Sequence, residues 1–301
     1  MSVVSFGLLP SIALGAGLSD HVDRKIRAKI PHNSRQVILV AGELKSSLDS
    51  NRVGLRRRSS NTVSLWKKKN GRWHLVQSGI KGRNGRNGWK PIAPTREHLL
   101  ADIHKHPKHT DRVYRTVDDL ASPIGVFSLT NAGGRLANPG TQLPWVTDTV
   151  VFDQTGQEQP FNSDGSWAKK GKGKPLDKTF NYVIGINYNR DRSRGMPLSS
   201  QKYLKPLGAA AGGDVWLHVA YGAPTHGCLV VKEKHIVKIL HWIDPKQRPV
   251  IIMGDKKSLR KKSSLKKNSR QALMKRHRFA GSDLDDAAVG RYLPLHFGRI
   301  T

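Results

Sequence analysis

The chain has 301 residues, and its 52 Lys and Arg outnumber its 22 Asp and Glu, which gives a formal net charge of +30. Its apolar content is that of a globular chain, so wholesale disorder is excluded. Roughly 100–200 residues form one domain, so this length allows one large domain with appendages or two small ones. No window holds the ~18 uninterrupted apolar residues of a membrane span. The single cysteine, Cys228, excludes a disulfide framework and a thiolate-rich metal site.

The N-terminal segment, residues 1–34, is predicted to be a secretory signal or an apolar arm. An apolar stretch rich in small residues runs from Val3 to Leu18, and Ala13-Leu14-Gly15 is a passable cleavage site. No positively charged region precedes this stretch. We expect an exported protein of the periplasm or cell wall.

Residues 35–254 are predicted to form one mainly β domain with few helices. Short apolar runs with β-branched and aromatic residues, separated by turns, are typical of strands. Asn70-Gly71 is the strongest hairpin signal and joins residues 62–66 to residues 72–76. The other predicted strands are residues 35–42, 124–129, 145–152, 180–189, 214–219, 227–231 and 248–254.

Two segments are predicted to be helical. Residues 233–243 place Ile236, Ile239, Leu240 and Ile243 on one face, and Pro245 ends the helix. Residues 95–120 also have a helical pattern, and they contain His98, His104, His106 and His109. Such histidines can bind copper, nickel or zinc, but a solvated loop around Pro107 is favoured because no carboxylate or cysteine completes a ligand set. No metal is expected.

Three glycines lie in the segment KGRNGRNGWK, residues 81–90. Phosphate-binding loops have a similar glycine content, but they are followed by a helix. Here Pro91 and Pro94 interrupt the backbone instead. A bulged strand or a surface loop is therefore predicted.

The densest chemistry lies in WLHVAYGAPTHGCLVV, residues 216–231, which holds His218, His226 and Cys228. A cysteine becomes a nucleophile when a neighbouring imidazole takes its proton. If the chain reverses around Gly222-Ala223, antiparallel pairing sets His218 opposite Gly227, one residue from the thiol. Backbone amides around Cys228 could then donate to a developing oxyanion.

The tetrapeptide THGC, residues 225–228, with a histidine on an upstream strand, resembles the signature of the L,D-transpeptidase (YkuD-type) catalytic-domain family. The resemblance extends over residues 37–254 and includes GRNG at 82–85, SPIGVFSL at 122–129 and the closing HWIDPKQRPVIIMG. It implies a β-sandwich-like fold, peptidoglycan stem peptides as substrates and no cofactor.

The resemblance also implies a role for each motif residue. Cys228 matches the nucleophile and His218 the general base, while His226 and Gly227 flank the oxyanion site and Thr225 matches the hydroxyl position. The implied reaction is 3→3 cross-linking, or carboxypeptidase action with water as the acceptor. The short gap between the two histidines and the Leu-Val-Val after the cysteine depart from the family pattern. A catalytically inactive cell-wall-binding relative is therefore the alternative.

Residues 255–301 form a predicted basic C-terminal extension. Its part from 256 to 280 carries eleven Lys and Arg and no acidic residue. Such a block is typical of a tail, and we expect it to bind anionic polymers of the cell envelope. A nucleic-acid-binding protein is a further alternative, because charge alone gives non-specific affinity for phosphates. No helix-turn-helix, zinc-finger or ribonucleoprotein motif is present, so no specific nucleic acid is expected.

Overall fold

A computed structural model describes residues 17–43, 59–117, 119–147, 150–152, 158–160, 179–189, 207–213, 215–220 and 222–260. All of them belong to one compact unit, residues 1–260. The predicted signal cleavage site and most of the basic extension lie outside the described residues. No helix in the described ranges is long and apolar enough to cross a membrane.

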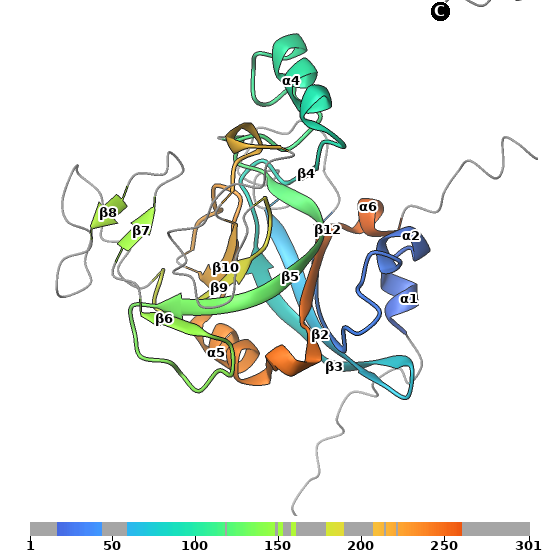
Figure 1. The fold of residues 1–301 in the computed structure, drawn as a ribbon, viewed down its shortest axis with the longest axis vertical. Helices are drawn as coiled ribbons and strands as arrows, with labels where there is room; N and C mark the ends of the chain where they lie inside the picture. The colour runs from blue at the N-terminus through green and yellow to red at the C-terminus, as the bar shows by residue number, and fades with distance from the viewer. Residues whose placement is uncertain are drawn as a thin grey trace, which may run out of the picture. The chain divides into compact units, whose positions relative to one another are not determined.

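Eight strands of the described chain close into a barrel (Figure 1), and the protein is mainly β with few helices, as predicted. Their order is β12-β1-β2-β3-β11-β10-β9-β5, and β5 pairs with β12 to complete the ring. They are β1 (Gln36–Gly42), β2 (Ser60–Lys69), β3 (Arg72–Arg83), β5 (Ser122–Gly134), β9 (Val183–Ile186), β10 (Trp216–Val219), β11 (Leu229–Val231) and β12 (Val250–Asp255). A sandwich-like arrangement is not confirmed, because hydrogen bonds join these strands into a single ring.

Four short strands lie outside this ring. β4 (Trp89–Pro91) and β6 (Trp145–Thr147) each pair with β5 in parallel. β7 (Val150–Phe152) and β8 (Glu158–Pro160) form a separate antiparallel pair.

The hairpin predicted from Asn70-Gly71 is confirmed. β2 and β3 pair from Lys69 opposite Arg72 outward, which leaves a two-residue loop. Both loop residues have positive φ, 48° at Asn70 and 75° at Gly71. This is the geometry of a type I′ turn, whose twist matches that of the strands it joins.

The helices cover the barrel in separate places. α5 (Glu233–Trp242) buries Ile236, Ile239 and Leu240, so its predicted apolar face is confirmed. α1 (Leu18–His21), α2 (Arg24–Arg27) and α6 (Lys256–Arg260) lie together beside β12 in Figure 1. Two 3-10 turns are η1 (Ala209–Ala211) and η2 (Pro245–Gln247).

The helix predicted over residues 95–120 is largely wrong. α4 spans only Arg96–Lys105, and Thr95 caps its N-terminus by accepting a hydrogen bond from the His98 amide. The chain then leaves the helix at His106, whose φ is −125°. Pro107 explains this ending, because the residue before a proline is disfavoured in helical geometry.

Residues near both ends of the described part of the compact unit pack together. Leu18 and Val22 share a buried cluster with Leu259, and the Asp23 amide donates to the Leu259 carbonyl at 2.7 Å. The described part of the predicted N-terminal arm is thus bound to the barrel, as is the first turn of the predicted basic extension.

Candidate functional site

The strand that carries His218 and the strand that follows Cys228 are parallel neighbours. β10 and β11 pair with Leu217 opposite Leu229 and His218 opposite Val230. The predicted antiparallel hairpin is therefore wrong. Short connections between strands usually make antiparallel hairpins. Here the connection between β10 and β11 returns the chain to the starting end of β10, so β11 runs in the same direction as β10.

The parallel register places the two predicted catalytic residues on one face. Leu217 and Leu229 point into the barrel core, so their neighbours along each strand point outward. If the register is extended by one residue toward the start of both strands, Cys228 lies beside Trp216. His218 follows Trp216 by two residues on β10 and therefore lies on the same face. The antiparallel register would have placed Cys228 opposite Leu217, on the other face from His218. Diagonal neighbours on one face lie about 7–8 Å apart, a distance that aromatic and long side chains can span.

An aromatic cluster connects the histidine to the cysteine. The Phe180 ring lies 5.1 Å from the His218 ring and 5.7 Å from the Trp216 ring, centroid to centroid. Cys228 is partly exposed and packs against Trp216 and Val183. The apolar face of this cluster thus limits the access of water to the imidazole, whereas Cys228 is only half-buried.

His218 is buried and neutral at pH 7. Burial is the main cause that lowers its pKa from 6.5 to about 4, and hydrogen bonds to the Val219 and Thr179 backbone oppose this shift. Its Nδ1 lies 3.1 Å from the Val219 carbonyl oxygen. A neutral imidazole has one N–H, so in the tautomer in which Nδ1 donates to Val219, Nε2 carries no proton.

The loop before Cys228 is held by the side chains of two hydroxyl residues. The Thr225 hydroxyl donates to the Cys228 carbonyl oxygen at 2.6 Å and accepts from the Gly227 amide at 3.2 Å. The Ser122 hydroxyl donates to the Gly227 carbonyl oxygen at 2.7 Å. The Gly227 amide, expected to face an oxyanion, is engaged with Thr225 in this state, and His226 is exposed.

The GRNG segment packs against this loop and is not a surface loop. Asn84 and Gly85 are buried, and Gly85 forms a bridge with Thr225. The Arg86 amide donates to the Thr225 carbonyl oxygen at 2.8 Å. A Cβ on Gly85 would lie 2.5 Å from the Leu120 carbonyl oxygen, so only glycine permits this close approach.

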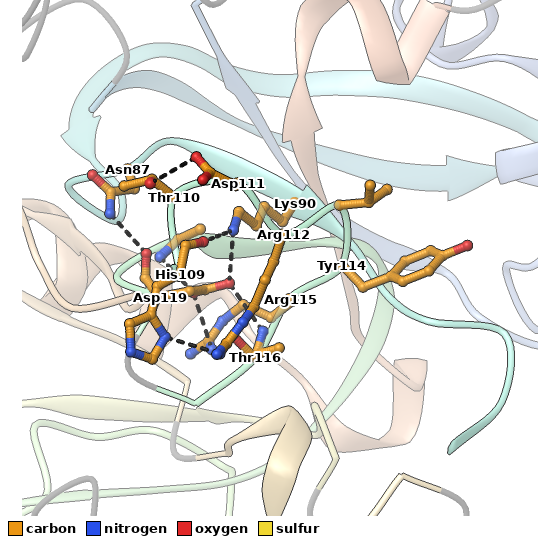
Figure 2. Close-up of polar contacts among 12 residues, drawn as sticks. Asn87, Lys90, His109, Thr110, Asp111, Arg112, Tyr114, Arg115, Thr116 and Asp119 are labelled. Carbon is orange, nitrogen blue, oxygen red and sulfur yellow. Dashed lines mark hydrogen bonds and ion pairs between the residues drawn. The ribbon is translucent and has the colours of Figure 1, made fainter. Parts of the chain in front are cut away.

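A buried cluster of charged side chains also packs against the loop before Cys228. Figure 2 shows its members Lys90, Arg115 and Asp119. Arg115 pairs with Asp119 at 3.1 Å, and Lys90 approaches the same carboxylate at 3.6 Å. A Cβ on Gly227 would lie 3.1 Å from Nη2 of Arg115. Sequence analysis missed Arg115, Ser122 and Phe180. Ser122 belongs to the SPIGVFSL segment, but the other two carry no local signal.

A groove of ≈ 500 Å³ adjoins the other end of the β10–β11 connection. Ala220 and Gly222 come from that connection, and the charged residues on its walls are three cations, Lys81, Arg83 and Lys232, and one carboxylate, Glu43. Neither His218 nor Cys228 lines this groove. The groove therefore carries an excess of positive charge and is separate from His218 and Cys228.

The histidine-rich segment forms no metal centre in the described part of the chain. No group of three or more His, Cys, Asp or Glu side chains there could hold a metal ion. Comparison with known proteins finds that neither a family model nor a curated relative matches the sequence.

Proposed function

We propose that the protein is a cysteine-dependent L,D-transpeptidase that acts on peptidoglycan stem peptides. The observation that carries this proposal is the parallel β10–β11 register, which brings a neutral buried imidazole and the only thiol of the chain to one face. The THGC motif that suggested the family lies at this point. The L,D-transpeptidase fold and an exported location belong to the same proposal.

The first half of the reaction forms a thioester. The Cys228 thiol gives its proton to His218 Nε2, and Sγ attacks the carbonyl carbon after the third residue of a tetrapeptide stem. The carbon–nitrogen bond then breaks, and the imidazolium returns the proton to the departing D-alanine amine. The low pKa of His218 makes its imidazolium a stronger acid, which favours this delivery and disfavours the preceding proton transfer from the thiol, whose ordinary pKa is about 8.5.

The second half resolves the thioester. An amine from a neighbouring stem attacks the thioester carbon, and the Sγ–carbon bond breaks. The proton of the attacking amine passes through His218 to the sulfur. This transfer restores the thiol and leaves a 3→3 amide cross-link. Water in place of the amine gives a carboxylic acid and thus carboxypeptidase action. The basic groove formed by Lys81, Arg83 and Lys232 suits the carboxylates of an acceptor stem.

The basic extension is proposed to hold the enzyme on anionic polymers of the cell envelope. A deletion that tests this role must begin after Arg260, because Leu259 is buried in the compact unit and its loss would disturb the fold. Eight Lys and Arg lie between residues 261 and 280. Deleting those residues should weaken retention on isolated sacculi at low salt and leave turnover of small stem peptides unchanged. Equal retention would exclude wall binding by this segment.

The decisive experiment is intact-mass detection of a carbapenem adduct, because this class acylates the family that the sequence resembles. We expect one adduct per chain, and none on Cys228→Ala. A folded protein without an adduct, or an adduct that persists on Cys228→Ala, would contradict the proposal.

A further inference from the structure

The groove beside the β10–β11 connection carries three cations that no described residue neutralises. Lys81 and Arg83 come from β3, Lys232 follows β11, and all three line the same space of ≈ 500 Å³. Within the described part of the chain, none of the three makes an ion pair. The carboxylate in the lining, Glu43, is already paired, since its Oε1 lies 2.8 Å from Nζ of Lys256. The groove therefore keeps its excess of positive charge.

The strand register places two of these cations directly side by side. β3 and β11 are antiparallel, with Val231 opposite Gly82. If this register is extended by one residue, Lys232 lies opposite Lys81. Val231 points into the barrel core, so both lysines point to the outer face. Like charges directly opposite each other are destabilising, and an anion between them would relieve this repulsion.

The same register leads from the groove to the proposed nucleophile. Arg83 lies opposite Val230, which follows Cys228 by two residues. Arg83 is therefore a diagonal neighbour of Cys228 on the outer face, at about 7–8 Å. Lys232 follows Cys228 by four residues, or about 13 Å of extended chain. A ligand that extends from the thiol for a few residues can reach all three cations.

We propose that this groove binds the acceptor of the reaction through a carboxylate, and that its three cations determine how often the thioester passes to an amine rather than to water. This inference rests on the proposed function. A carboxylate held by Arg83, or between Lys81 and Lys232, would keep the amine of the same peptide beside Cys228. Ammonium and guanidinium groups bind carboxylates through charge-assisted hydrogen bonds.

Amine and water compete for the same carbon atom. The amine nitrogen bonds to the thioester carbon, the bond to Sγ breaks, and the amine proton passes through His218 to the sulfur. Water reacts in the same way and gives a carboxylic acid. A bound acceptor raises the local concentration of amine but not of water, so the groove changes the ratio of the two products.

The test measures this ratio. The full-length protein receives an N-acetylated tetrapeptide donor and a tripeptide stem whose third residue carries the amine, with its terminal carboxylate either free or amidated. Mass spectrometry gives the ratio of cross-linked to hydrolysed product, which does not depend on the acylation rate because both products come from one thioester. We expect Lys81→Gln to lower the ratio about two- to fivefold more for the free carboxylate than for the amide, as the loss of an exposed ion pair predicts.

Lys69→Gln is the matched control. Lys69 is an exposed residue at the far end of the same hairpin and does not line the groove. Both substitutions remove one charge from a protein of net charge +30, so long-range attraction of anions changes equally. The two ratios in Lys69→Gln should match those of the wild type. An equal fall in Lys69→Gln and Lys81→Gln would contradict a local role of the groove.

A second measurement follows binding without turnover. In Cys228→Ala the acceptor cannot react, and calorimetry gives the Kd of each stem. The stem with the free carboxylate should bind more tightly than the amide, and the combined variant Lys81→Gln/Lys232→Gln should remove this difference. Both lysines are exposed, so the variant should fold.

The outcomes separate this inference from the proposed function. Equal affinity for the two stems, or a difference that persists in the combined variant, would overturn the role of the groove alone. A wild-type protein that forms no thioester with the donor would overturn the proposed function and the acceptor role with it.

Discussion

The barrel contains two parallel strand pairs, β1–β12 and β10–β11, whose outer faces differ. The β1–β12 pair runs through six residue pairs, from Val37 opposite Val250 to Gly42 opposite Asp255. Its outer face is covered by apolar residues of the short helices α1 and α6. The β10–β11 pair has three residue pairs, and its outer face carries Trp216, His218 and Cys228.

The inner faces of the two pairs are alike, since both contribute to the same apolar core. The difference lies outside, where one pair is sealed by aliphatic side chains and the other presents titratable groups beside aromatic rings. If the proposed function is right, stability and chemistry depend on different outer faces of the same barrel. Substitutions on the two outer faces should therefore have separable effects.

The largest expected effect is the loss of turnover in Cys228→Ala. The change removes the only thiol but little volume, so muropeptide cross-linking should fall by at least about 10³-fold while the thermal midpoint stays close to that of the wild type. Mass spectrometry of the products and a thermal melt test this. Unchanged product formation would exclude a cysteine-dependent enzyme.

The matched variant on the other pair is Ile252→Ala, which is fully buried in the outer cluster of β12. It should lower the free energy of unfolding by about 2–5 kcal/mol and leave turnover per folded molecule unchanged. If Ile252→Ala reduced the chemistry as strongly as Cys228→Ala, the separation of the two faces would be wrong.

The next effect distinguishes the two histidines near the thiol. His218→Ala removes the buried proton acceptor and should slow single-turnover acylation by roughly 10²–10⁴-fold. His226 is exposed and precedes the buried Gly227, so His226→Ala should change the rate by less than about tenfold. Stopped-flow or quenched acylation with a carbapenem measures both rates. The reverse order would exchange the two roles.

Local signals predicted much of the fold but only part of the site. Asn70-Gly71 and the apolar face of α5 are encoded within a few residues, so turn chemistry and periodicity suffice. The direction of β11 is not encoded within a few residues. It depends on contacts between residues far apart in the sequence, such as Gly85 with Thr225 and Ser122 with Gly227. The THGC motif singled out Cys228 as the proposed nucleophile, although the predicted register was wrong.

The charged wall of the site was beyond local prediction for a different reason. Arg115 and Asp119 lie in a stretch of ordinary charged composition. The sequence alone does not distinguish a buried charged residue from a solvent-exposed one. Only the tertiary approach of Gly212 and Gly227 shows where the guanidinium lies. Such residues become visible through three-dimensional packing.

A third prediction concerns the dependence of stability on pH. The unfolded chain protonates His218 near its ordinary pKa of 6.5, whereas burial delays protonation of the folded chain until about pH 4. The unfolded state therefore binds more protons between these values, and stability falls as the pH drops from 6.5 to 4. The total contribution is about 3 kcal/mol.

Urea unfolding at a series of pH values from 7 to 4 measures this slope. His218→Gln should flatten it, whereas His226→Gln, on the exposed loop, should leave it as in the wild type. An unchanged slope in His218→Gln would mean that other groups cause the acid sensitivity and that His218 is not buried in its neutral form.

The smallest expected effect compares two glycines of the β10–β11 connection. Gly222 and Gly227 both have positive φ, 98° and 134°, so alanine strains the backbone at either position. A Cβ at Gly222 meets nothing within 4 Å, whereas at Gly227 it would lie 3.0 Å from the Ala121 carbonyl oxygen and 3.1 Å from Arg115. We expect Gly222→Ala to cost about 1 kcal/mol of unfolding free energy and Gly227→Ala about 1–3 kcal/mol.

The two variants should differ more clearly in the reactivity of the thiol than in stability. In Gly227→Ala the methyl group would crowd the Ala121 carbonyl oxygen and the Arg115 guanidinium, so the loop before Cys228 must shift and the rate of thiol alkylation by iodoacetamide should change. In Gly222→Ala nothing lies within 4 Å of the methyl group, and the rate should stay at the wild-type value. If both variants kept the wild-type rate, the loop could accommodate a side chain at Gly227, and the close approach of Arg115 would not be what requires glycine there.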